Sequence, residues 1–233
     1  MPSLKSEFRF HSRGFQETLI LIPGWATDWR IFDGLELDYN YLLITKPDVS
    51  DFNRRILDKI DQLKINKVSV LGFSLGGFLA AEFASAYPAR IAELILVGVR
   101  KQYEPQLLIN IKREILKDLR PWLYKFYLNC FSRADKLGLA WFRQNLLKEY
   151  SDKLNADELI RGLDYLASHA LPIEALKRIE AVSIFHGADD IVALPKEVLE
   201  IKAELPKAKF KLLADRGHLC FLGCNFRENF YHG

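Results

Sequence analysis

Three side chains of this sequence could together perform nucleophilic catalysis: a serine, a histidine and an aspartate. Ser74 stands in the pattern Gly72-Phe73-Ser74-Leu75-Gly76, directly after the apolar residues 68–71. An apolar run, G-x-S-x-G and a helical run predict a tight strand-to-helix turn, with glycine where a side chain would collide across it. Because a serine hydroxyl is a weak nucleophile, it needs a base within hydrogen-bond reach. Ser74 is the candidate nucleophile.

The base that such a serine requires is a histidine held by a carboxylate. His218 follows the apolar segment 209–213, and Asp190 follows the apolar segment 182–186. All three side chains therefore come just after expected strands. In open α/β sheets the functional site lies at the carboxyl ends of the strands, so we expect Ser74, Asp190 and His218 to meet there.

Other residues of the same types compete for these roles. The remaining histidines are His11, His169, His186 and His232, and we interpret them as packed or exposed side chains. Asp189 directly precedes Asp190 and competes with it, whereas Asp215 is a more distant third. An aspartate after a strand is often only a turn former. The sequence favours Asp190 and leaves Asp189 open.

An ester carbonyl attacked by serine also needs donors for its developing oxyanion. One expected donor is the backbone N–H of Leu75, the residue after the nucleophile. The other is the backbone N–H of Trp25, which follows the apolar run 18–22 and the turn Pro23-Gly24. Loss of one such donor typically costs about 3 kcal/mol of transition-state stabilisation.

Strand and helix patterns alternate along most of the chain, which predicts an α/β fold with a mostly parallel sheet flanked by helices. Apolar, strand-like runs occupy residues 7–11, 18–22, 39–45, 68–71, 93–99, 182–186 and 209–213. Helical spacing occupies residues 51–63 and 75–87, and a further helix opens at Pro195. We expect residues 1–100 and 170–233 to form this core.

Residues 101–169 break the alternation and predict an inserted helical lid. Helical patterns run from Pro105 to about residue 119, restart at Pro121, cover residues 134–148 and begin again after the cap Asn155. Between residues 112 and 148, nine basic side chains stand against three acidic ones. A basic lid would steer an acidic partner toward the site. The candidate partner-binding residues are Arg113, Lys117, Arg120, Lys125, Arg133 and Arg143, the first three expected on one side of one helix if Pro121 does not disturb it.

The charge, the hydropathy pattern and the cysteine content exclude several classes of protein. The 233 residues carry a formal charge of +3, and no recognition motif for nucleic acid accompanies the basic residues. No apolar run is long enough to span a membrane, and residues 1–7 have no apolar signal region. Three cysteines cannot all pair within one chain, so we expect reduced thiols and a cytoplasmic location. Cys220 and Cys224 lack further ligands for a metal, and no cofactor is expected.

Together these residues resemble the α/β-hydrolase family. The resemblance rests on the Pro23-Gly24-Trp25 loop, the turn at Ser74, and Gly187 with Asp190 and Gly217-His218. It implies a serine carboxylesterase that needs neither metal nor organic cofactor. The Gly24-Trp25 loop and the segments 162–166 and 176–179 are similar to an esterase whose acyl substrate is held by acyl carrier protein. These carriers are strongly acidic, which suits the basic lid.

Three other functions stay open at this point. The chain could be an esterase or thioesterase for small free esters, with the lid charge incidental. It could be a lyase on the same fold, in which a similar group of residues abstracts a proton. A silent fold that only binds ligand is disfavoured by the presence of Ser74, Asp190 and His218.

Overall fold

A seven-stranded sheet forms the centre of the computed structural model, which describes residues 7–45 and 49–231. The strand order is β1-β3-β2-β4-β5-β6-β7; β1 is antiparallel to β3, and the other neighbours pair in parallel. The predicted mostly parallel sheet is confirmed. The strands are β1 (Phe8–His11), β2 (Thr18–Ile22), β3 (Asn40–Ile44), β4 (Val68–Phe73), β5 (Ile91–Val97), β6 (Val182–Gly187) and β7 (Lys209–Leu213).

The central strands are apolar without alternation because both of their faces are covered. Every residue of β2, β3 and β4 is buried, as expected for parallel strands between two layers. The register aligns their carboxyl ends: Ile22 lies opposite Gly72, Phe73 opposite Val97, and Gly187 opposite Leu213. The loops that follow these strands therefore gather at one edge of the sheet.

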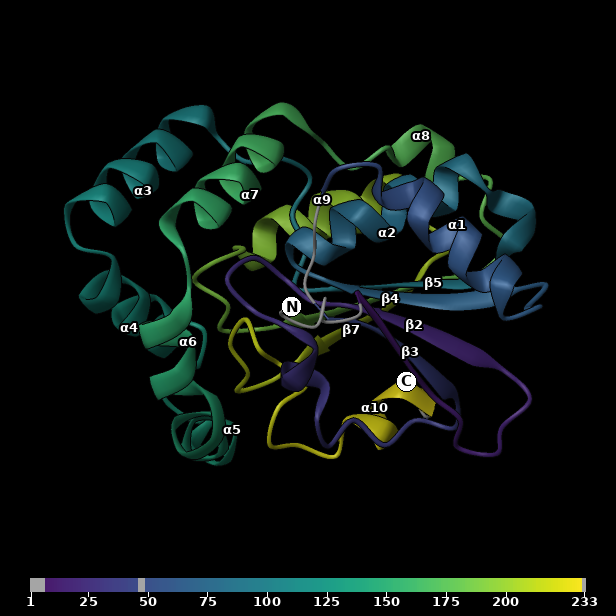
Figure 1. The fold of residues 1–233 in the computed structure, drawn as a ribbon, viewed down its shortest axis with the longest axis horizontal. Helices are drawn as coiled ribbons and strands as arrows, with labels where there is room; N and C mark the ends of the chain where they lie inside the picture. Colours follow the sequence, from purple (N-terminus) through teal and green to yellow (C-terminus); the bar gives the residue numbers. More distant parts are fainter. Residues whose placement is uncertain (1–6, 46–48, 232–233) are drawn as a thin grey trace, which may run out of the picture.

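Helices cover both faces of the sheet (Figure 1). In that view α1 (Phe52–Gln62), α2 (Leu75–Ala86), α8 (Ile173–Leu176) and α9 (Pro195–Glu204) lie above it, and α10 (Phe226–Tyr231) lies below. Helix α2 is buried at nine positions, which explains why its sequence is apolar on most sides. Among the helices of the described residues, none has the length and apolar character needed to cross a bilayer.

Residues 101–169, here called the helical insertion, connect β5 to β6 and lie to the left in Figure 1. Their helices are α3 (Pro105–Lys117), α4 (Leu119–Asn129), α5 (Lys136–Phe142), a π-helical turn (Arg143–Leu147), α6 (Lys148–Lys153) and α7 (Ala156–Ser168). The insertion leaves and rejoins the core at adjacent points, because Gln102 and Ala170 form an antiparallel bridge. The Leu171 N–H also donates to the Lys101 carbonyl oxygen at 2.9 Å.

The shared helix face that three of the basic residues would form without a disturbance at Pro121 is absent. Arg113, Lys117 and Arg120 do not share a helix, since α3 ends at Lys117 and Asp118 has extended backbone (φ −159°, ψ 93°). Pro121 explains the break, because in a continuous helix its ring would clash with the Lys117 carbonyl. Helix α4 instead begins at Leu119, which places Pro121 in its first turn.

The sequence-based expectations for residues 1–6 and for His232 lie outside the described residues.

Candidate active site

Ser74 occupies the sharp turn between β4 and α2, in the strained backbone conformation that the G-x-S-x-G pattern predicts. Its φ is 53° and its ψ is −117°, a region that non-glycine residues adopt at an energetic cost. Hydrogen bonds hold the turn: the Ser74 N–H donates to the Val97 carbonyl oxygen at 2.9 Å, and the Gly77 N–H to that of Ser74 at 2.8 Å. A Cβ on Gly76 would overlap the Ile22 carbonyl, so only glycine allows α2 to approach β2 there.

The structure brings Ser74, His218 and Asp190 together at the carboxyl edge of the sheet. His218 Nε2 lies 3.0 Å from Ser74 Oγ, and His218 Nδ1 lies 2.7 Å from Asp190 Oδ2. All three residues are buried, Ser74 being 7% exposed. This arrangement can deprotonate the serine hydroxyl and stabilise the imidazolium that forms.

Of the competing aspartates, Asp190 is the one that contacts His218. Its other oxygen, Oδ1, accepts the N–H groups of Val192 at 2.8 Å and Ala193 at 2.9 Å, which fixes the carboxylate orientation. Asp189 is exposed, although it directly precedes Asp190. Asp215 is also exposed, on the loop after β7. A choice between adjacent aspartates depends on this loop geometry, which the sequence pattern does not encode.

The loops that carry Asp190 and His218 are bonded to each other. The Ala188 N–H donates to the Leu213 carbonyl oxygen at 2.8 Å, and the Asp189 N–H to that of Arg216 at 2.9 Å. A Cβ on Gly187 would overlap the Gly217 carbonyl, so the close approach requires glycine. The two loops thus form a single rigid support for the imidazole.

His186 is packed, as the sequence predicts, but it also contacts the Asp190 carboxylate. Its Nε2 lies 2.8 Å from the Ala193 carbonyl oxygen and 3.4 Å from Asp190 Oδ2. Burial lowers the pKa of His186, so the ring is neutral and Nε2 carries the proton donated to Ala193. Its position four residues before Asp190 at a strand end is the signal that could have identified this contact.

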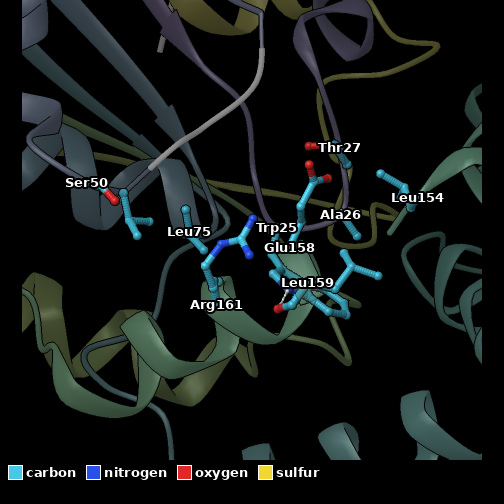
Figure 2. A pocket seen from close by; sticks show the side chains of 11 residues that line it. Trp25, Ala26, Thr27, Ser50, Leu75, Leu154, Glu158, Leu159 and Arg161 are labelled. Atoms are coloured by element: carbon cyan, nitrogen blue, oxygen red, sulfur yellow. Dashed lines mark hydrogen bonds between the residues drawn. The ribbon is translucent and has the colours of Figure 1, made fainter. Parts of the chain in front are cut away.

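Trp25 and Leu75, the expected oxyanion donors, line one cavity of about 280 Å³ beside the turn. Among the hydrogen bonds of the described residues, none uses the backbone N–H of either residue. Figure 2 shows Trp25 and Leu75 with Glu158 and Arg161 of α7 nearby, and the bond from Trp25 Nε1 to the Leu159 carbonyl oxygen, which measures 2.8 Å. Neither N–H group therefore has a protein partner among the described residues that would compete with a ligand.

A second cavity, of about 270 Å³, opens onto Ser74 itself. Two aromatic side chains of α4, Trp122 and Phe126, line this cavity. Two other aromatic side chains of the insertion, Tyr127 of α4 and Trp141 of α5, do not line it. Apart from Ser74, Tyr103 and Asn129, its lining is apolar: Trp25, Leu107, Leu108, Ile111, Trp122, Phe126, Leu163, Leu166, Ile191 and Val192. Such a cavity suits an uncharged acyl chain.

Tyr103 is a polar neighbour of Ser74 that the sequence analysis missed. Its ring packs against Phe78 at a centroid distance of 6.0 Å, with the Arg100 guanidinium 4.6 Å from the ring centroid. Burial raises the pKa of Tyr103 to about 12, although the nearby Arg100 charge acts in the opposite direction. The phenol is therefore protonated at neutral pH.

The six basic residues predicted to bind a partner are exposed on the insertion. Arg120 pairs with Asp152 across α4 and α6 at 2.7 Å. Arg120 and Arg143 line one surface groove together with Lys148 and Tyr124. Arg113 and Lys117 lie on α3, Lys125 on α4, and Arg133 between α4 and α5.

Within residues 7–45 and 49–231, no cluster of side chains could hold a metal ion, and all three cysteines are free. Burial raises the pKa of the Cys130 and Cys220 thiols well above their ordinary value, and it raises that of Cys224 less strongly. A raised pKa means less of the reactive thiolate near neutral pH.

We expect iodoacetamide at neutral pH to leave Cys130 and Cys220 unmodified in the native protein, because both are buried and protonated. Half-buried Cys224 should react slowly, and all three should react once the chain is unfolded. Peptide mass spectrometry of native and urea-unfolded samples measures this. Faster native labelling of Cys130 than of Cys224 would contradict the expectation.

Known proteins with similar sequences or folds include hydrolases and esterases. The chain is 26% identical to a pimeloyl-[acyl-carrier protein] methyl ester esterase of Nitrosomonas europaea, over 91% of this chain and 92% of that protein. It is 32% identical to a 2-hydroxy-6-oxononadienedioate/2-hydroxy-6-oxononatrienedioate hydrolase of Paraburkholderia phymatum, over 87% and 81%. An esterase from Exiguobacterium antarcticum has a similar fold, with a TM-score of 0.78 at 19% identity over 96% of this chain and 92% of that one.

The family profile described as the alpha/beta hydrolase fold matches residues 38–223. That range includes the turn at Ser74, the insertion and the loops of Asp190 and His218. The predicted fold class and the prediction of a hydrolase acting on ester bonds are thereby confirmed. This chain belongs to the α/β hydrolase fold family.

Proposed function

We propose that this protein is a serine carboxylesterase in which Ser74 is the nucleophile, His218 the general base and acid, and Asp190 the group that orients His218. The observation that carries the proposal is the position of the His218 ring, 3.0 Å from Ser74 Oγ and 2.7 Å from Asp190 Oδ2. A hydrogen-bonded serine, histidine and aspartate at these distances is the requirement for acyl transfer through serine.

The reaction proceeds in two halves. His218 Nε2 takes the Ser74 proton while Oγ attacks the ester carbonyl, and the N–H groups of Trp25 and Leu75 hold the oxyanion. His218 then returns the proton to the leaving alkoxide, which departs as the alcohol and leaves an acyl-serine. A water molecule gives its proton to His218 and attacks the acyl-serine. Collapse of the second intermediate releases the acid and restores Ser74.

The proposed substrate is the methyl ester of pimeloyl-[acyl-carrier protein], which links the protein to biotin synthesis. The relative from Nitrosomonas europaea, which aligns over 91% of this chain, supports this choice. The lining of the Ser74 cavity supports it too, because no charged side chain of the described residues is part of it. A free carboxylate, as in the dioate named for the Paraburkholderia phymatum relative, would be buried there without a partner.

The direct test is hydrolysis of methyl pimeloyl-[acyl-carrier protein], followed by mass spectrometry of the carrier. We expect conversion to the free acid by the wild-type protein and none by a Ser74→Ala variant. Growth rescue of a biotin-requiring strain that lacks its own esterase is the test in cells. Hydrolysis of small free esters without any action on the carrier-bound ester would favour a general esterase instead.

We further propose that the acidic acyl carrier protein binds to the helical insertion. We place the reaction in the cytoplasm, where the cysteine thiols of this protein stay reduced. We expect charge reversal of Arg113 and Lys117 to lower kcat/KM for the carrier-bound ester about tenfold, because steering by surface charge acts on association. Hydrolysis of p-nitrophenyl butyrate should be unchanged. Added salt should reduce the difference between wild type and variant, since exposed charges are screened.

The matched control reverses Lys207 and Lys209, which are exposed at the start of β7, away from the carboxyl edge. This control variant should process both substrates like the wild type. Equal losses in the two variants would mean that net charge matters and that the insertion is not a docking surface.

A further inference from the structure

The loop that carries the Trp25 N–H is bonded to the helical insertion at three of four consecutive residues. Trp25, Ala26 and Asp28 each have a hydrogen-bond partner in a different helix of the insertion. The loop also has local bonds: the Thr27 N–H and Oγ1 both donate to the Gly24 carbonyl oxygen, at 3.3 and 2.9 Å, and Asp28 Oδ1 accepts the Arg30 N–H at 3.0 Å. The insertion therefore supplies much of what fixes this loop.

Tyr127 of α4 provides the most direct of these contacts. Its hydroxyl donates to the Ala26 carbonyl oxygen at 2.5 Å, and its side chain is fully buried. Ala26 has a φ of 59°, in the left-handed region that L-residues rarely adopt without support. Ala26 directly follows Trp25 in the chain. A change in the backbone dihedral angles of Ala26 would therefore also reorient the Trp25 backbone.

Tyr150 of α6 provides the second contact. Its hydroxyl donates to Asp28 Oδ1 at 2.7 Å and accepts the Asp28 N–H at 3.2 Å. Arg30 supports this carboxylate through an ion pair at 2.7 Å and reaches Glu149 beside Tyr150 at 2.6 Å. The rings of Tyr127 and Tyr150 pack together, with centroids 5.7 Å apart.

The third contact is made by Trp25 itself. Its indole Nε1 donates to the Leu159 carbonyl oxygen of α7 at 2.8 Å. Its ring packs edge-on against Trp122 and Phe126 of α4, at 5.8 and 5.2 Å. The side chain is thus fixed by the insertion on both its polar and its apolar sides.

We propose that Tyr127 and Tyr150 are positioning residues of the oxyanion site, so that the insertion completes the catalytic centre as well as covering it. The hydroxyls hold the loop in the conformation that aims the Trp25 N–H at the oxyanion. This inference rests on the proposed function, because an oxyanion must form for the position of that N–H to matter. Neither tyrosine lines the cavity that opens onto Ser74, so their role is separate from substrate contact.

The test compares Tyr127→Phe and Tyr150→Phe with Tyr124→Phe, an exposed tyrosine on α4 as matched control. For p-nitrophenyl butyrate we expect kcat to fall about 10- to 100-fold in the first two variants, since small misplacements of catalytic groups have effects of that size. KM should change less than threefold, and the pH profile should keep its shape because His218 and Asp190 are untouched. The labelling rate of Ser74 by a fluorophosphonate should fall in parallel.

Each outcome bears on a definite claim. Normal kcat and labelling in folded Tyr127→Phe and Tyr150→Phe proteins would overturn the inference and leave the esterase proposal intact. A wild-type protein that neither hydrolyses the ester nor reacts with the fluorophosphonate would overturn both. If Tyr127→Phe does not fold, Tyr150→Phe decides, since Arg30 still holds Asp28 there. Loss of the fold in both variants would also overturn the inference, because the hydroxyls would then serve stability.

Discussion

Replacing Ser74 by alanine is expected to lower kcat by about 10⁶-fold, the loss typical when a serine hydrolase loses its nucleophile. The reason is local: the hydroxyl 3.0 Å from His218 Nε2 is the group that forms the acyl-serine in our proposal. The fold should persist, since the Ser74 N–H and C=O bonds to Val97 and Gly77 do not involve the hydroxyl. Single-turnover hydrolysis and circular dichroism of the purified variant measure both effects.

Ser85→Ala is the matched control for this prediction. Ser85 lies on the same helix as the turn, and its hydroxyl donates only to the Ala81 carbonyl oxygen one helical turn earlier, at 2.7 Å. We expect its kcat to stay within about twofold of wild type, because the half-buried Ser85 hydroxyl bonds within its own helix and substitutions away from special features have small effects. Activity above about a hundredth of wild type in Ser74→Ala would refute the nucleophile assignment, since triad loss removes far more.

Asp190→Asn is expected to lower kcat about 10⁴-fold, as removal of the orienting carboxylate does in serine hydrolases. The geometry predicts why. The backbone N–H groups of Val192 and Ala193 would keep the amide oxygen in the Oδ1 position. The amide NH₂ would then face His218 Nδ1 and force the proton onto Nε2, which could no longer accept the Ser74 proton.

The neighbouring substitution Asp189→Asn separates the two aspartates. Asp189 is exposed, and its backbone N–H bond to the Arg216 carbonyl is independent of the side chain. Its kcat should therefore stay close to wild type under the same assay. A larger loss in Asp189→Asn than in Asp190→Asn would reverse the assignment.

The sequence predicts the sheet well because its strands are marked by local patterns. The continuous apolar runs of β2 and β4 indicate buried strands. The glycines around Ser74 indicate a tight turn. Parallel pairing then brings the strand ends, and with them Ser74 and His218, to the same edge. The sequence pattern predicts the position of these residues in the fold, because the carboxyl ends of parallel strands lie at the same edge of the sheet.

The contacts between the insertion and the core are not predictable in this way. Tyr127 follows Phe126 on one helix, and both are aromatic, yet Phe126 lines the Ser74 cavity whereas Tyr127 donates to Ala26. Helical spacing assigns faces, but it does not say what each face meets. The exact position of the break between α3 and α4 was not predictable either: the sequence pattern restarts the helix at Pro121, whereas α4 begins two residues earlier, at Leu119.

The base of the insertion has a consequence for how such proteins diversify. Because the chain leaves the core at Gln102 and returns beside it at Ala170, a relative's entire helical block could be grafted there without shifting any strand. The graft would lose Tyr127, Tyr150 and the Leu159 carbonyl at once. A new helical block that changes specificity must therefore also provide hydrogen bonds to residues 25–28. Substrate recognition and catalytic rate then change together when the block is exchanged.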